Sequence, residues 1–245
     1  MTAVAGREFA ALAPLAAKLG VRLSAAQIAV CERYASELIE RNTSVNLTAI
    51  TEPAAIAVKH FLDSFTALAV RTWTGTERVI DVGSGAGFPG LALRIAVGGL
   101  RLTCAESVGK KARFIEDVTA VLGLGDVEVR NERAEVLARS ARRAGSYDVG
   151  TARAVGSIGA CAEYLLPFLR VGGDAIVWKG RVDAELPGAR KALAALGGEL
   201  AAIVSTADLG LGDELPGRSL VVMRKTRPTP ERYPRPSVEA RRRPW

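Results

Sequence analysis

The stretch VIDVGSGAGFPGLAL, Val79–Leu93, decides the fold of this chain. A short apolar run ends at Asp81, glycines follow at positions 83, 85 and 87, and apolar residues with helical spacing come next. Glycine adopts backbone angles that other residues avoid, and it lets a ligand approach the main chain. Three alternating glycines after an aspartate exceed what a tight turn needs. The stretch therefore predicts a strand, a ligand-binding turn and a helix.

Apolar runs and helical patterns alternate along the chain from Arg78 onward, and one of the helical patterns covers residues 134–143. Strand–helix units in series predict an α/β fold with a doubly wound, mainly parallel sheet. Two further candidate strands, Glu199–Leu209 and Arg218–Lys225, have no helix between them and predict a hairpin at the sheet edge. Together with five preceding strands they make a seven-stranded, Rossmann-like sheet.

The remaining segments suggest three parts. Residues 1–55 are expected to form an N-terminal helical extension packed on the core, with Ser24 capping an amphipathic helix. Residues 56–225 are expected to form the domain that contains the sheet and the glycine turn. Residues 226–245 are rich in proline and arginine, have little to bury, and are expected to form a basic, disordered tail.

The composition indicates what kind of partner the protein binds and which kinds of protein it does not resemble. The net charge is +7, and residues 223–245 contribute +6 of it, which indicates a polyanionic partner. No apolar run reaches the roughly 18 residues of a membrane span, so we expect a cytoplasmic protein without membrane contact, and a monomer. Cys31, Cys104 and Cys161 lie far apart, which favours buried thiols over a disulfide framework or a metal site.

The glycine turn also limits the ligand. The dinucleotide pattern G-x-G-x-x-G requires a small third residue, and Phe88 stands there. No lysine follows the glycines as a triphosphate loop would require. The spacing suits a nucleoside without a pyrophosphate. Glu106, at the end of the second strand, can accept hydrogen bonds from ribose hydroxyls. After the third strand, Ala134 offers backbone groups near an adenine edge, and Glu135 is a candidate acceptor or a charge at a helix start.

Several motifs together resemble those of S-adenosylmethionine-dependent methyltransferases. The resemblance is closer to the bacterial 16S ribosomal RNA small-subunit methyltransferase G family, also called glucose-inhibited division protein B. It spans about residues 41–225 and is carried by NLTAI (46–50), HFLDS (60–64), GFPG (87–90), RAE (133–135) and RAV (153–155).

The resemblance implies a specific activity. It implies methylation of N7 of one guanine, of the guanine-527 type, in 16S ribosomal RNA or the small ribosomal subunit, with S-adenosylmethionine as cofactor. It implies cofactor contacts at the positions that match the family motifs, which are Gly83, Phe88, Ala134, Glu135 and Arg153. The residues themselves add Gly85 and Glu106 to this set.

Guanine N7 has its own lone pair, so this transfer needs no general base and no covalent intermediate. Positioning is what remains for the protein to supply. Arg153 and Lys179, at the ends of the fourth and fifth strands, are the positioning candidates, and Lys179 is assigned to an RNA phosphate. His60 and Asp63 are expected to serve in a helix–loop hydrogen bond bordering the pocket. Trp73, Trp178 and Phe88 are candidates for stacking on a base, and core packing is the expected use of the two tryptophans.

Alternatives stay open at this point. A methyltransferase acting on another RNA, a small molecule or a protein keeps the glycine turn and needs no basic surface. A nucleoside-binding or RNA-chaperone module keeps cofactor binding and lacks transfer. A dehydrogenase is disfavoured by Phe88.

Overall fold

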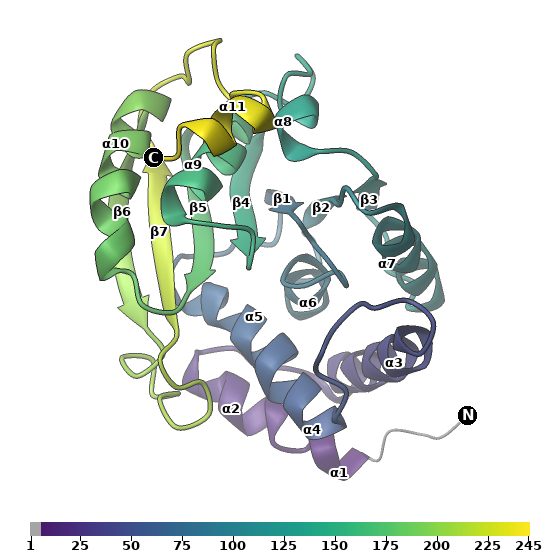
Figure 1. Cartoon of the computed structure of the whole chain (residues 1–245). Helices are drawn as coiled ribbons and strands as arrows, with labels where there is room; N and C mark the ends of the chain where they lie inside the picture. Colours follow the sequence, from purple (N-terminus) through teal and green to yellow (C-terminus); the bar gives the residue numbers. More distant parts are fainter. Residues whose placement is uncertain (1–5) are drawn as a thin grey trace.

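A computed structural model describes residues 6–245 and places one seven-stranded sheet between two layers of helices (Figure 1). The strands lie in the order β3-β2-β1-β4-β5-β7-β6. The first five pair in parallel, whereas β7 is antiparallel to both β5 and β6. The predicted doubly wound sheet and its edge hairpin are confirmed. The strands are β1 Arg78–Val82, β2 Arg101–Ala105, β3 Val127–Arg130, β4 Tyr147–Arg153, β5 Leu169–Lys179, β6 Gly198–Ser205 and β7 Ser219–Lys225.

Helices precede, connect and follow the strands. Those before the sheet are α1 Gly6–Phe9, α2 Leu12–Lys18, α3 Ala25–Asn42, α4 Pro53–Ile56, the π-helical η1 Ala57–Leu62, α5 Asp63–Phe65 and η2 Thr66–Ala69. The later ones are α6 Gly90–Ala96, α7 Gly109–Val121, α8 Ala134–Leu137, α9 Ile158–Leu165, η3 Leu166–Phe168, η4 Asp183–Glu185, α10 Leu186–Leu196 and α11 Ser237–Arg242.

The long helix α3 begins where the sequence predicts. The Ser24 hydroxyl accepts from the Gln27 N–H at 3.2 Å, and the Gln27 side chain accepts from the Ser24 N–H at 2.9 Å. This reciprocal pair satisfies two backbone donors at the helix start. The apolar stripe of α3, including Tyr34 and Leu38, is buried. Helix α3 is thereby fixed on one face of the sheet.

Each face of the sheet has its own core. One hydrophobic cluster contains residues of α1–α7, among them Phe9, Phe61 and Phe114. The other contains α9 and α10, with Phe168 and Leu193. The N-terminal helices therefore pack into the first core. Residues 1–5 of the predicted extension lie outside the described residues, and its boundary at residue 55 stays a prediction.

Two expectations about local structure are wrong. The sequence predicts a helix over 134–143, but α8 ends at Leu137 because the following turns carry Arg143 to Glu128, which it meets at 2.6 and 2.7 Å. The sequence also predicts a disordered tail, whereas the structure packs residues 226–245 against α9 and α10 and forms α11 (Figure 1). Buried contacts of Tyr233 and Trp245, which composition alone does not reveal, account for this order.

The described part of the chain, residues 6–245, has no helix with the length and apolarity required to span a bilayer. All three cysteines are buried, as predicted.

Candidate functional site

The glycine turn leaves β1 beside β4, where the strand order of the sheet reverses. Ligands of doubly wound sheets bind outside the carboxyl ends of the strands at such a point. Gly83 and Gly85 have φ angles of +69° and +61°, which side-chain-bearing residues rarely adopt. A Cβ added to Gly83 would lie 2.8 Å from Cγ2 of Val155. The turn therefore requires glycine for both its backbone angle and its close contact.

Asp81 holds the base of this turn. Its carboxylate accepts from the Thr151 hydroxyl of β4 at 2.8 Å and from the N–H of Gly90, at the start of α6, at 3.2 Å. Burial raises the pKa of Asp81 to about 6, although these hydrogen bonds partly oppose the shift. Asp81 therefore joins two strands and a helix beneath the turn.

Glu106 faces the same turn from the end of β2. Its two carboxylate oxygens accept from the N–H groups of Gly85 and Val108, each at 2.8 Å. The side chain is almost fully buried. A carboxylate has about four acceptor positions, so two remain for hydroxyl donors after these bonds. Glu106 thus orders the turn and keeps capacity to accept from a ligand.

A cleft of about 160 Å³ lies between these strand ends. Of the predicted cofactor residues it is lined by Gly83, Ala134 and Glu135. Val155 and Tyr164 complete its wall. Small-molecule sites usually measure roughly 300–1,000 Å³. Val155 lies directly against Gly83 at this cleft.

Arg153 lies on the other side of the glycine turn, at the end of β4. Its Nη1 donates to Oδ2 of Asp63 at 2.8 Å, and the Asp63 side chain is fully buried. Its Nη2 lies 3.3 Å from Nδ1 of His60. Arginine only donates, so Nδ1 of His60 accepts and its Nε2 carries the proton toward the Thr48 hydroxyl, 2.9 Å away. The predicted helix–loop hydrogen bond of His60 is confirmed.

His60 is held neutral in this cluster. Burial, together with the smaller effect of the positive charges of Arg153 and Arg218, lowers the pKa of His60 to about 3. A histidine with this pKa does not exchange protons near neutral pH.

Phe88 does not present a ring face to solvent. Its ring stacks between those of Tyr34, at 4.8 Å, and His60, at 4.7 Å. The expectation that Phe88 stacks on a base is therefore wrong for this arrangement, because both faces are taken. The guanidinium of Arg153 lies 5.6 Å from the centre of the same ring. The role of Phe88 in this structure is to connect α3, η1 and Arg153.

Lys179 bonds neither to the residues that line the cleft nor to the cluster of Arg153, Asp63 and His60. Its Nζ lies 2.8 Å from Oε1 of Glu185 and donates to the Gly156 carbonyl at 2.8 Å. Trp178, one residue earlier, donates from its indole N–H to the Asp63 carbonyl at 2.7 Å. Core packing of this tryptophan, as predicted, is confirmed.

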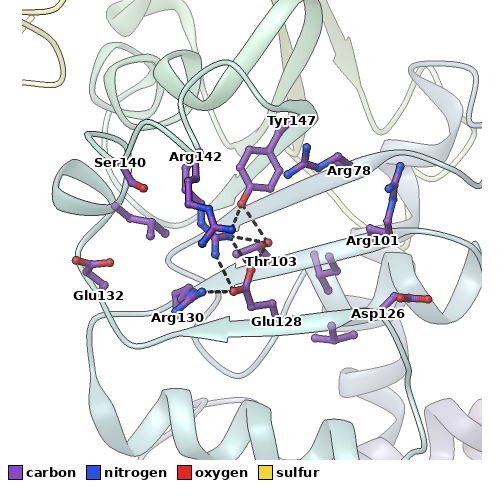
Figure 2. A pocket seen from close by; sticks show the side chains of 14 residues that line it. Arg78, Arg101, Thr103, Asp126, Glu128, Arg130, Glu132, Ser140, Arg142 and Tyr147 are labelled. Atoms are coloured by element: carbon purple, nitrogen blue, oxygen red, sulfur yellow. Dashed lines mark hydrogen bonds and ion pairs between the residues drawn. The ribbon is translucent and has the colours of Figure 1, made fainter.

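A larger hollow of about 820 Å³ lies over β1–β3, where the short α8 leaves the sheet face uncovered (Figure 2). Figure 2 shows the Glu128 carboxylate bonded to arginines and the Tyr147 hydroxyl close by. None of the predicted site residues lines it. It touches the narrow cleft only at Glu132, which lines both. The narrow cleft at the glycine turn is therefore the better candidate for the cofactor site.

The structure adds residues that the sequence reasoning missed. Tyr34 donates to the carbonyl of Ala86 in the glycine turn, and Val155 covers Gly83. Thr48 orients His60. In the sequence, Tyr34 is recognisable only as part of an apolar stripe, and its hydroxyl is the one feature that indicates a buried hydrogen bond. Val155 carried no signal beyond its place in the RAV motif.

Comparison with known proteins gives the family. The family model of rRNA small subunit methyltransferase G matches residues 27–210. "Ribosomal RNA small subunit methyltransferase G" of Roseiflexus castenholzii is 45% identical over 226 residues, which cover 90% of this chain and 93% of the relative. The protein of the same name from Geobacillus thermodenitrificans is 39% identical, with 88% and 90% covered.

Solved structures agree on the fold. A ribosomal protein L11 methylase from Lactobacillus delbrueckii has a TM-score of 0.52 at 15% identity, covering 69% of this chain and 79% of that one. A putative methyltransferase complex with Trm112 from Haloferax volcanii has a TM-score of 0.54 at 14% identity, covering 71% and 93%. The methyl donor that this family and fold imply is S-adenosylmethionine. Because the family model matches residues 27–210, which are most of this chain, the chain belongs to the rRNA small subunit methyltransferase G family.

Proposed function

We propose that this protein methylates N7 of one guanine in 16S ribosomal RNA, at a site of the guanine-527 type. The methyl group comes from S-adenosylmethionine, without a covalent intermediate or an obligatory general base. The observation that carries the proposal is family membership over about nine-tenths of the chain. The cluster around Arg153 and the buried cysteines support the finer chemistry.

The cleft at the glycine turn is the proposed cofactor site. Gly83 offers backbone without a side chain at the cleft, which Ala134 and Glu135 also line, and Gly85 continues the same turn. Glu106 supplies a buried carboxylate with acceptor positions left for ribose hydroxyls. The donor set fits a nucleoside, and Val155 lines the cleft next to Gly83. S-adenosylmethionine supplies an electrophilic methyl group when bound.

Guanine N7 supplies its own electron pair, so the chain need not remove a proton. His60 agrees with this requirement, because it is neutral and its ring nitrogens are already engaged by Arg153 and Thr48. The thiols agree as well, since burial raises the pKa of Cys161 to about 12 and leaves little thiolate for covalent attack. What the protein contributes is orientation.

Arg153 is the proposed positioning residue. The buried Asp63 fixes its guanidinium beside Phe88, at the rim of the glycine turn. From there it can hold the carboxylate of the cofactor or the incoming nucleotide through its remaining donors. The proposed contact between Lys179 and an RNA phosphate requires exchange with Glu185, so we give it the smaller role.

A transfer assay tests the proposal. Purified protein is incubated with methyl-labelled S-adenosylmethionine and small-subunit RNA from cells lacking the protein. We expect label in this RNA and none in RNA whose target N7 is already methylated. Transfer to a small molecule or to another RNA alone would favour the alternative methyltransferases, and binding of the cofactor without transfer would favour a non-catalytic module. We further propose that the protein acts on this substrate in the cytoplasm and that it is a monomer, which sedimentation tests.

A further inference from the structure

The C-terminal segment is fixed by one buried carboxylate. Glu163, on α9, is almost fully buried. The guanidinium of Arg235 donates to it from Nη2 at 2.6 Å and from Nε at 2.8 Å, and the Arg235 N–H donates at 2.7 Å. The indole N–H of Trp245 donates to the same carboxylate at 2.7 Å. Both ends of residues 235–245 are therefore tied to one point.

The surface beneath Trp245 is shaped for it. A Cβ added to Gly159 of α9, or to Gly188 of α10, would lie 2.7 Å from atoms of Trp245. Glycine inside a helix is less stable than alanine, so one glycine against the Trp245 side chain and another against its backbone carbonyl indicate a built seat. The Trp245 ring also lies 4.4 Å from the Arg235 guanidinium and packs near Tyr233.

The fixed segment lies beside the cofactor cleft. Arg139, just after α8, donates to the Pro234 carbonyl at 2.8 Å. Tyr164 of the cleft wall packs on the same hydrophobic cluster as Trp245. In Figure 1, α11 lies at the same end of the molecule as α8 and α9.

The segment also places positive charges on the surface of the protein. Arg241, Arg242 and Arg243 are exposed, and none of them forms an ion pair with any of residues 6–245. We call these three residues the arginine rim. Because the anchors already order the backbone, binding a polyanion here does not incur the cost of folding a disordered tail.

We propose that the arginine rim binds the phosphate backbone of the RNA substrate beside the cofactor cleft. This inference rests on the proposed function, in that it takes RNA as the substrate. The cofactor supplies the methyl group, whereas the rim binds the RNA. The rim should therefore govern the KM for RNA and leave cofactor affinity unchanged.

A matched pair of variants tests the rim. Arg241→Gln/Arg242→Gln removes two rim charges, and Arg22→Gln/Arg33→Gln removes two exposed charges near and on α3. RNA affinity is measured as a function of salt, with cofactor affinity measured in parallel. Each phosphate contact on a single strand contributes about 0.7 to the salt slope, so the rim variant should lose about 1.4 from the slope, while the control keeps it. Equal losses in both variants would overturn the proposal.

A second variant separates a fixed rim from a loose basic tail. Trp245→Ala removes one anchor and keeps every arginine. We expect a raised KM for RNA, faster tryptic cleavage after the rim arginines, and unchanged cofactor affinity, which also reports that the core is folded. Unchanged KM together with faster cleavage would show that charge alone suffices and would overturn the fixed rim. If wild-type protein transfers no methyl to ribosomal RNA, the proposed function fails; if wild type transfers and the rim variant behaves like wild type, only the rim fails.

Discussion

The Arg153 guanidinium lies 2.8 Å from the carboxylate of Asp63, and the Asp63 side chain is closed to solvent. The Arg153 side chain is only 11% exposed. Removing one partner of a buried ion pair leaves the other charge without compensation, which typically costs about 3–5 kcal/mol. The pair thus links the helix of the HFLDS motif to the end of β4, and it makes the position of Arg153 depend on Asp63.

Asp63→Asn should therefore affect both stability and turnover. We expect the free energy of unfolding to fall by about 3–5 kcal/mol and kcat/KM for methyl transfer to fall by up to about a hundredfold, because misplaced groups lose that much. Denaturant unfolding and the transfer assay measure these effects. Asp117→Asn, which breaks the half-exposed pair with Arg41, should cost no more than about 1 kcal/mol. Equal stability losses in the two variants would contradict the account.

Gly83→Ala should impair cofactor binding through Val155. The added Cβ would meet Val155 at 2.8 Å and push it against the cleft. We expect the Kd for S-adenosylmethionine to rise about tenfold, equivalent to about 1.4 kcal/mol, by calorimetry. Gly20→Ala is the matched control, since Gly20 has a similar φ of +75° and open space around its Cβ. It should leave the Kd unchanged.

Gly83→Ala/Val155→Ala separates contact from backbone strain. Val155→Ala removes the methyl group that the new Cβ would meet. We expect the double variant to recover most of the lost affinity. Affinity as low as in Gly83→Ala alone would show that the φ angle, and not Val155, sets the effect.

His60 is the only histidine in the chain, so its titration can be followed by NMR in tag-free protein. Burial lowers its pKa to about 3, so its ring signals should stay constant from pH 8 to pH 5. The unfolded chain takes up this proton near pH 6.5. The stability that neutral His60 contributes is therefore complete above about pH 6.5 and declines as the pH falls toward 3. A titration midpoint near 6.5 in the folded protein would contradict this environment.

Cys161→Ala tests the absence of covalent catalysis. Because burial raises the pKa of this thiol to about 12, we expect kcat to stay within about twofold of wild type. Iodoacetamide should leave the folded protein active. Loss of turnover in Cys161→Ala, with cofactor affinity and stability retained, would support a covalent route.

The sheet and the glycine turn were predictable because they depend on local patterns. Alternating strand and helix periods gave the parallel sheet, and the left-handed angles of Gly83 and Gly85 follow from residue type. The partners of the site were not predictable, because they come from distant segments. Nothing near Phe88 in the sequence indicates that Tyr34 and His60 cover its two faces.

The order of residues 226–245 also could not be predicted from the local sequence. Their composition predicts disorder, but Glu163 and two helical glycines far upstream build the seat of this segment. The short α8 is a further example. The chain leaves the helical conformation after Leu137, and Arg143 forms an ion pair with Glu128 of β3. In each case a long-range polar contact outweighs the local pattern.

Mass mapping of 16S ribosomal RNA from cells that lack this protein tests the central claim most directly. The account predicts that one guanine loses one methyl group at N7, that the wild-type gene restores it, and that the Gly83→Ala gene restores it poorly. A methylation pattern of the small-subunit RNA that is identical with and without the protein would contradict it.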